Sequence, residues 1–176
     1  NKIEKMFGSR IYYLPADKAI GLGLICQPQW MIAEVKGNRR KNLAQGAVQA
    51  FIEFGNRNVF DVKTLINCKD TKDLKTIVGS RQVKALYQSH TGFMSAEISS
   101  ERGCIIDGKK VDRPTWIKTI NTHIGPLMVL HIDICNAGID VPGFNLPMWT
   151  YLPASETYQI QGDGRGARLS DKDRSL

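Results

Sequence analysis

Two arginines near the end of the sequence, in the stretch YQIQGDGRGAR (158–168), combine a residue type and a spacing that suit phosphate chemistry. Arg165 and Arg168 stand three positions apart, so on a helix they would share one face. A guanidinium group matches two phosphate oxygens in a planar, bidentate way that an ammonium group cannot reproduce. The pattern therefore favours two arginines that point at one phosphate. The alternative, on this stretch alone, is a pair of surface cations near a helix end.

A second stretch places one carboxylate in a tight turn behind an apolar segment. PLMVLHIDI (126–134) is a nearly continuous apolar run, which is typical of a strand covered on both faces of a sheet. NAGIDVP (136–142) follows it and carries Asp140. The sequence has no GxxxxGK(S/T) pattern and therefore lacks the usual loop that binds a triphosphate.

The elements that must position these residues alternate along the chain. We expect a helical turn at 17–21, a strand at 30–35 and a helix at 43–55. The pattern then predicts a strand at 62–67, a helix at 70–86 capped by Asp70 or Thr71, a short strand at 87–93, a largely helical stretch at 95–123 broken near Gly103, Gly108 and Pro114, and strands at 126–134 and 148–153. This alternation is typical of an α/β fold with a mainly parallel sheet flanked by helices.

Residues that follow the predicted strands are candidates for binding, because ligands of parallel sheets lie beyond the carboxyl ends of the strands. On this prediction Cys68 and Lys69 follow one strand, and Thr91 and Gly92 follow the next. The stretches that contain Asp140 and the two arginines follow the last two strands.

Composition restricts the class of protein. The 176 residues suffice for one domain. The formal net charge of +7 fits a polyanionic partner, such as nucleic acid or a nucleotide, and fits a merely solvated basic surface equally well. For the basic stretch KGNRRKN (36–42), a solvated loop is favoured over a DNA-binding patch. The cysteines and histidines show no metal-ligand spacing, so we expect no metal site and reduced cysteines. With no run of ~18 apolar residues and no signal peptide, we expect a cytoplasmic protein that has no membrane partner.

The two stretches together resemble motifs V and VI of superfamily-two helicases and translocases, and the restriction-enzyme and phage-type branch fits best. NAGIDVP is similar to motif V, which ends in A-G-x-D and is often followed by a hydrophobic residue and proline. Motif VI reads Q-x-x-G-R-x-x-R, and Gln161, Gly164, Arg165 and Arg168 match every fixed position. Upstream, VKTLINCKDTKDLKTIV resembles motif IV, and HTGFMSAEISSERGCI resembles the "TG…S…ER" segment of the family.

The resemblance implies a RecA-like three-layer domain in an ATP-dependent DNA helicase. Residues 1–42 would be the linker from a missing first motor domain, and 43–176 would be the second motor domain. The first domain would hold most of the contacts to ATP and Mg²⁺. The chain by itself is therefore expected to show no ATPase activity. A non-enzymatic nucleic-acid-binding or adaptor module derived from such a domain is the alternative, and RNA in place of DNA stays open.

The resemblance also implies roles for single residues at the nucleotide. Arg165 and Arg168 would reach the γ-phosphate of ATP, one of them as arginine finger, and Gln161 would bind the γ-phosphate or the attacking water. Asp140 would accept a hydrogen bond from the ribose, with a turn-stabilising carboxylate as the alternative. Gly138 would let the backbone approach the nucleotide closely, and Gly164 would also belong to the nucleotide-binding residues.

A second set of residues would contact nucleic acid. Cys68, Lys69, Thr91 and Gly92 would contact backbone phosphates, and Asp133 would orient the motif V loop. Contacts of this kind carry little sequence information, which suits a motor that tracks any sequence.

Overall fold

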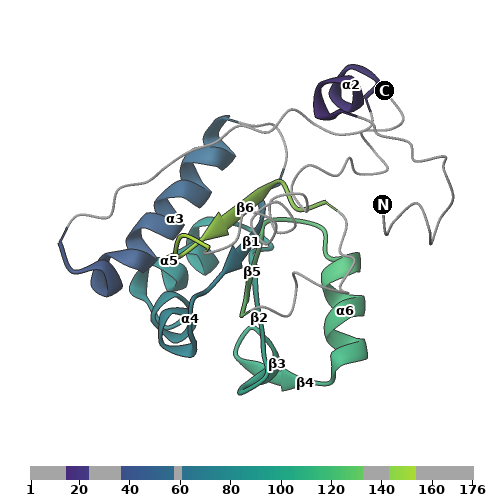
Figure 1. Cartoon of the computed structure of the whole chain (residues 1–176). Helices are drawn as coiled ribbons and strands as arrows, with labels where there is room; N and C mark the ends of the chain where they lie inside the picture. Colours follow the sequence, from purple (N-terminus) through teal and green to yellow (C-terminus); the bar gives the residue numbers. More distant parts are fainter. Residues whose placement is uncertain (1–14, 24–36, 58–60, 133–142, 154–176) are drawn as a thin grey trace, which may run out of the picture.

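The computed structural model describes residues 15–23, 37–57, 61–132 and 143–153, and within these ranges it forms one six-stranded sheet flanked by helices (Figure 1). The strand order is β4-β3-β2-β5-β1-β6. The strands are β1 (Lys63–Asn67), β2 (Met94–Ser99), β3 (Gly103–Ile106), β4 (Lys109–Val111), β5 (Leu127–His131) and β6 (Leu146–Trp149). The helices are α2 (Ala16–Gly21), α3 (Arg39–Arg57), α4 (Thr71–Val78), α5 (Arg81–Ser89) and α6 (Arg113–Thr122).

The sheet confirms the predicted α/β class. Strands β2, β5, β1 and β6 run parallel to one another, whereas β3 and β4 pair antiparallel at one side of the sheet. Figure 1 shows α3, α4 and α5 on one face and α6 on the other, an arrangement compatible with a RecA-like three-layer fold. None of the helices in the described ranges combines the length and apolar character needed to cross a bilayer.

The core has two halves because successive side chains of a strand point to opposite faces of the sheet. In β1, Ile66 packs with the α3, α4 and α5 side, whereas Leu65 packs with the α6 side. Phe51 of α3 and Trp116 of α6 are fully buried on the two sides. Strands covered on both faces read as continuous apolar runs, which is why the sequence predicts a strand in the run 126–134; the structure has β5 at Leu127–His131 within it.

The predicted helix at 70–86 is two helices in the structure. Helix α4 ends at Val78 with Gly79 as its C-cap, and Ser80 caps the start of α5 by accepting a hydrogen bond from the Val83 amide at 3.1 Å. Asp70, rather than Thr71, caps α4, and its carboxylate accepts from the Asp73 amide at 2.8 Å. Helix α3 begins at Arg39, inside the basic stretch that was expected to be a loop.

The predictions for residues 87–123 are largely wrong. Residues 87–89 end α5 and residues 90–92 form a turn, so the strand β2 begins only at Met94. The stretch expected to be helical contains β2, β3 and β4, and only its end forms α6. Asp107 and Gly108 connect β3 to β4 with φ values of 46° and 78°. An Asp-Gly pair between two apolar or β-branched runs is a strong hairpin signal, and it was available in the sequence.

Tyr87 of α5 ties this hairpin to the rest of the sheet. Its hydroxyl donates to Asp107 Oδ1 at 2.7 Å and lies 2.7 Å from Ser95 Oγ. The same Asp107 oxygen accepts from the Ser95 amide at 2.9 Å. Burial, opposed by the Ser95 hydroxyl and supported by the Asp107 carboxylate, raises the pKa of Tyr87 to about 12.

We expect Tyr87→Phe to lower the free energy of unfolding by about 1 kcal/mol at pH 8, because the hydroxyl hydrogen bonds are lost. The contribution of Tyr87 is fully present below the ordinary tyrosine pKa near 10 and is lost as pH rises through its raised value of about 12. Urea unfolding of both proteins at pH 8 and pH 11 measures this. The difference in the free energy of unfolding between the two proteins should be smaller at pH 11 than at pH 8. An equal difference at both pH values would contradict the stabilising role of the Tyr87 hydroxyl.

Candidate nucleic-acid interface

The carboxyl ends of the four parallel strands meet at one edge of the sheet. Asn67, the last residue of β1, is in register with His131 at the end of β5 and with Trp149 at the end of β6. His131 is in turn in register with Ile98 of β2. The chain segments that follow these strands therefore start side by side at what we call the carboxyl edge. NAGIDVP follows β5, and the stretch with the two arginines follows β6.

The residues predicted to contact the nucleotide cannot be placed at this edge. Seven predicted site residues lie outside the described residues: Asp133, Gly138, Asp140, Gln161, Gly164, Arg165 and Arg168. The strand expected at 30–35 also lies outside them. Their predicted roles therefore stay predictions. The structure establishes the positions of β5 and β6, from which these segments continue.

Cys68 and Lys69 lie at the carboxyl edge, as predicted, but only Lys69 is exposed. The Cys68 side chain is fully buried in the core between the sheet and the helices, and its thiol lies 3.9 Å from the Ile66 carbonyl oxygen. Burial, followed by the nearby carboxylate of Asp73, raises the pKa of Cys68 well above its ordinary range. A buried neutral thiol is a core group, so the predicted phosphate contact of the Cys68 side chain has no support in this conformation.

Thr91 and Gly92 lie at the opposite edge of the sheet from Lys69. They precede β2 rather than follow a strand, because the turn of residues 90–92 links α5 to the amino end of β2. Gly92 has a φ of 74°, and a Cβ at the neighbouring Gly125 would come within 3.3 Å of its carbonyl oxygen. Glycine at positions 92 and 125 thus allows two turns to pack closely at the edge of the sheet where the parallel strands begin. The structure does not bring these two residues together with Lys69.

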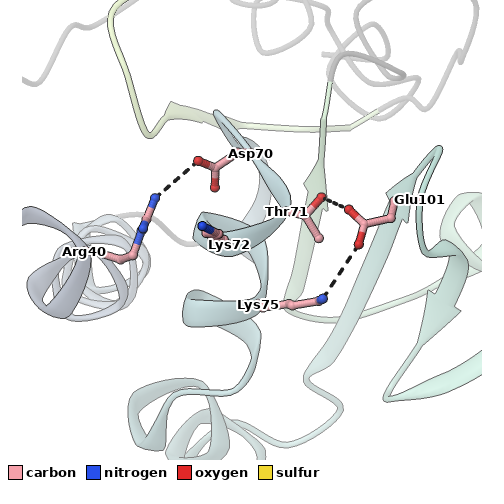
Figure 2. A pocket seen from close by; sticks show the side chains of 6 residues that line it. All are labelled: Arg40, Asp70, Thr71, Lys72, Lys75 and Glu101. Atoms are coloured by element: carbon pink, nitrogen blue, oxygen red, sulfur yellow. Dashed lines mark hydrogen bonds and ion pairs between the residues drawn. The ribbon is translucent and has the colours of Figure 1, made fainter.

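A pocket that the sequence analysis did not identify opens at the carboxyl edge, with a volume of about 340 Å³ (Figure 2). Side chains from three separate parts of the chain line it: Arg40 from α3, Asp70, Thr71, Lys72 and Lys75 from the start of α4, and Glu101 from the turn after β2. Lysines three positions apart at the start of a predicted helix were the available signal for Lys72 and Lys75. Nothing local in the sequence indicates that Arg40 or Glu101 joins them.

Two weak ion pairs lie among the charges of the pocket, and Lys72 takes part in neither. Arg40 lies 3.3 Å from the Asp70 carboxylate, and Lys75 lies 3.8 Å from Glu101, which also accepts from the Thr71 hydroxyl at 2.5 Å (Figure 2). These side chains are roughly half exposed, and such exposed ion pairs contribute about 0–1 kcal/mol each. The Lys75–Glu101 pair can therefore open for a competing anion at little cost, whereas Arg40 is also held by the buried Asp73 carboxylate at 3.3 Å.

The pocket and its surroundings carry an excess of positive charge. Three cations and two carboxylates line it, which leaves a net charge of +1, and Lys69 adds a further exposed ammonium at the same edge. Within the described ranges, no ion pair involves the ammonium groups of Lys69 or Lys72. The Asp73 amide, and next the Arg40 guanidinium, hold the pKa of Asp70 below its usual value, so this carboxylate stays charged at neutral pH. The arrangement suits the phosphates of an extended strand.

The described residues offer little to a metal ion. In that part of the chain, no group of three or more histidine, cysteine, aspartate or glutamate side chains has the geometry to hold one. Comparison with known proteins adds no assignment, because neither a protein-family model nor a curated protein matches the chain. The functional argument therefore depends on the residues and their arrangement.

Proposed function

We propose that the chain is the second motor domain of an ATP-dependent DNA helicase or translocase of superfamily two, within a longer protein. The observation that carries this proposal is the parallel register of β1, β2, β5 and β6 at the carboxyl edge. Because of it, β5 and β6, which the segments that resemble motifs V and VI follow in the chain, end on either side of β1, the strand that leads into Lys69 and the basic pocket. A motor needs its nucleotide contacts coupled to its nucleic-acid contacts.

At the nucleotide, the proposal assigns charge stabilisation to the arginines. Arg165 and Arg168 bind the γ-phosphate from across a cleft, and Gln161 orients the γ-phosphate or the attacking water. Asp140 binds the ribose. The first motor domain supplies the phosphate loop and the ligands of Mg²⁺, since this sequence has no phosphate loop of its own. ATP supplies the bond whose hydrolysis opens and closes the cleft between the domains.

At the nucleic acid, the proposal assigns the phosphate contacts to lysines of one segment. Lys69, Lys72 and Lys75 lie on the turn after β1 and the first turns of α4, and all three are exposed. An extended strand along this segment would meet successive ammonium groups. Because phosphate contacts position a strand without reading its bases, the interface binds DNA of any sequence, and RNA is an alternative ligand.

We expect Lys72→Ala/Lys75→Ala to weaken binding of a labelled single-stranded oligonucleotide and to flatten its salt dependence. Loss of two phosphate contacts should make the negative slope of the log association constant against log salt concentration shallower by about 1.4, at roughly 0.7 per contact for single strands. The measurement is fluorescence anisotropy on the chain at several salt concentrations. The matched control is Lys109→Ala/Lys110→Ala, which removes the same charge from exposed positions on β4, the strand at the other side of the sheet from β1 and β6. Equal losses in both variants would argue against a defined interface.

The second candidate function is a non-enzymatic nucleic-acid-binding adaptor, favoured by the lack of a phosphate loop in the sequence. The two functions agree on DNA binding and differ on hydrolysis. ATP turnover by the longer protein that is stimulated by DNA supports the motor, whereas binding without turnover supports the adaptor.

A further inference from the structure

The carboxyl edge contains a buried carboxylate that connects three elements. Asp73 of α4 has no exposed side-chain surface, and its two oxygens lie 2.7 Å from Arg39 Nη2 and 3.3 Å from Arg40 Nε. Both arginines belong to α3. The hydroxyl of Thr150, the residue directly after β6, donates to the same carboxylate at 3.3 Å. Helices α3 and α4 and the end of β6 are therefore joined at one point.

Thr150 is fixed by contacts to every polar atom that it has. Its amide donates to the Asn67 carbonyl at 3.0 Å, and its carbonyl accepts from Arg39 at 2.5 Å. Its hydroxyl accepts from the Lys69 amide at 3.0 Å while it donates to Asp73. The amide and carbonyl contacts would form with any residue other than proline at this position, because they use only the backbone. The hydroxyl adds a direct connection between the turn after β1 and the chain leaving β6.

This connection joins the two surfaces of the proposed motor. Lys69 is the exposed cation that begins the proposed nucleic-acid contact, and its backbone amide is held by the Thr150 hydroxyl. The chain beyond Thr150 leads to Gln161, Arg165 and Arg168. A displacement of the Lys69 backbone on phosphate binding must either carry the hydroxyl with it or break the hydrogen bond. Either a shift of Thr150 or the loss of its hydrogen bond to Lys69 changes the contacts that fix the chain where it leaves β6.

We propose that Thr150 is a positioning residue through which nucleic acid bound at Lys69 acts on the segment that carries Arg165 and Arg168. The inference rests on the proposed function, because it takes that function's two surfaces as the ends of the connection. Thr150 touches neither ligand, and it acts by holding the chain at the exit of β6. Coupling between two sites of this kind typically amounts to a factor of about 5–150.

The test is hydrogen exchange of the chain with and without a single-stranded oligonucleotide, followed in peptides from residue 143 onward. In the wild type, the oligonucleotide should slow exchange after β6 as well as at residues 69–75, by about fivefold or more. Thr150→Val keeps the shape of the side chain and removes both hydroxyl hydrogen bonds. It should retain DNA binding and slowed exchange at 69–75, and it should lose the effect after β6. Thr150→Ser keeps the hydroxyl and should restore that effect.

The outcomes separate this inference from the proposed function. If the wild type binds DNA and exchange after β6 does not change, the inference is wrong and the proposed function is unaffected, whether or not the valine variant folds. Equal behaviour of Thr150→Val and the wild type would also overturn it. If the wild type binds no DNA at any salt concentration, the proposed function fails and the inference fails with it.

Discussion

Arg165→Ala in the longer protein is expected to lower DNA-stimulated ATP turnover by about three to five orders of magnitude, the usual contribution of an arginine finger. The guanidinium neutralises charge that develops on the γ-phosphate in the transition state, and alanine offers no replacement for it. Because this interaction strengthens in the transition state, the loss should fall mainly on kcat rather than on KM. Steady-state hydrolysis measured with and without single- and double-stranded DNA gives both constants.

Three variants sharpen this experiment. Arg168→Ala shows which of the two arginines is the finger, since the more damaging substitution identifies it. Arg165→Lys keeps the charge without the planar fork and should recover only part of the turnover. Arg174→Ala removes the same side chain just beyond the Q-x-x-G-R-x-x-R pattern and should leave turnover unchanged. Turnover that is indifferent to Arg165, or absent from the wild type, would reject the motor and favour the adaptor.

The second large effect concerns stability. Arg39→Ala/Arg40→Ala is expected to lower the free energy of unfolding of the chain by about 3–5 kcal/mol, because it leaves the Asp73 carboxylate buried without a cation. The arginines themselves are nearly half exposed, so their own desolvation is small in comparison. Urea unfolding followed by circular dichroism at pH 7 measures the loss.

A third substitution tests the reason for this loss. Adding Asp73→Asn to the double variant removes the uncompensated charge and should recover part of the stability. The matched control, Arg81→Ala/Lys84→Ala on the exposed side of α5, should change stability by no more than about 0.5 kcal/mol. A double variant within that margin would show that Asp73 does not depend on the two arginines.

Local patterns predicted the elements whose environment is uniform along their length. Helix α3 was recognisable because its apolar residues recur at helical spacing, and β5 because a strand buried on both faces is apolar throughout. Asp70 was one of two proposed caps, and its short carboxylate reaches the Asp73 amide of the first turn. In each case, the residues that determine the structure lie within a few positions of one another.

Local patterns failed where pairing with distant segments decides the structure. Strand β2 is buried along its whole length although it contains Ser95, Glu97 and Ser99, because β5 and β3 pair with its two edges and helices pack on the faces of the sheet. Because of those polar residues, the segment lacks the apolar run typical of a buried strand, and a helix was predicted instead. The Asp107-Gly108 turn was visible in the sequence, but it predicts a hairpin only when its flanks are already seen as strands.

The sequence by itself determined which chemistry is available. The residue types and spacing of Gln161, Arg165 and Arg168, the turn at Asp140 and the α/β alternation all depend on neighbours in the chain. The tertiary structure decided which residues meet. It buries Cys68, moves Thr91 and Gly92 to the opposite edge from Lys69, and brings Arg40, Lys72 and Glu101 around one pocket. The physical reason is that strand order and direction, which place these residues, come from hydrogen bonding between strands far apart in the sequence.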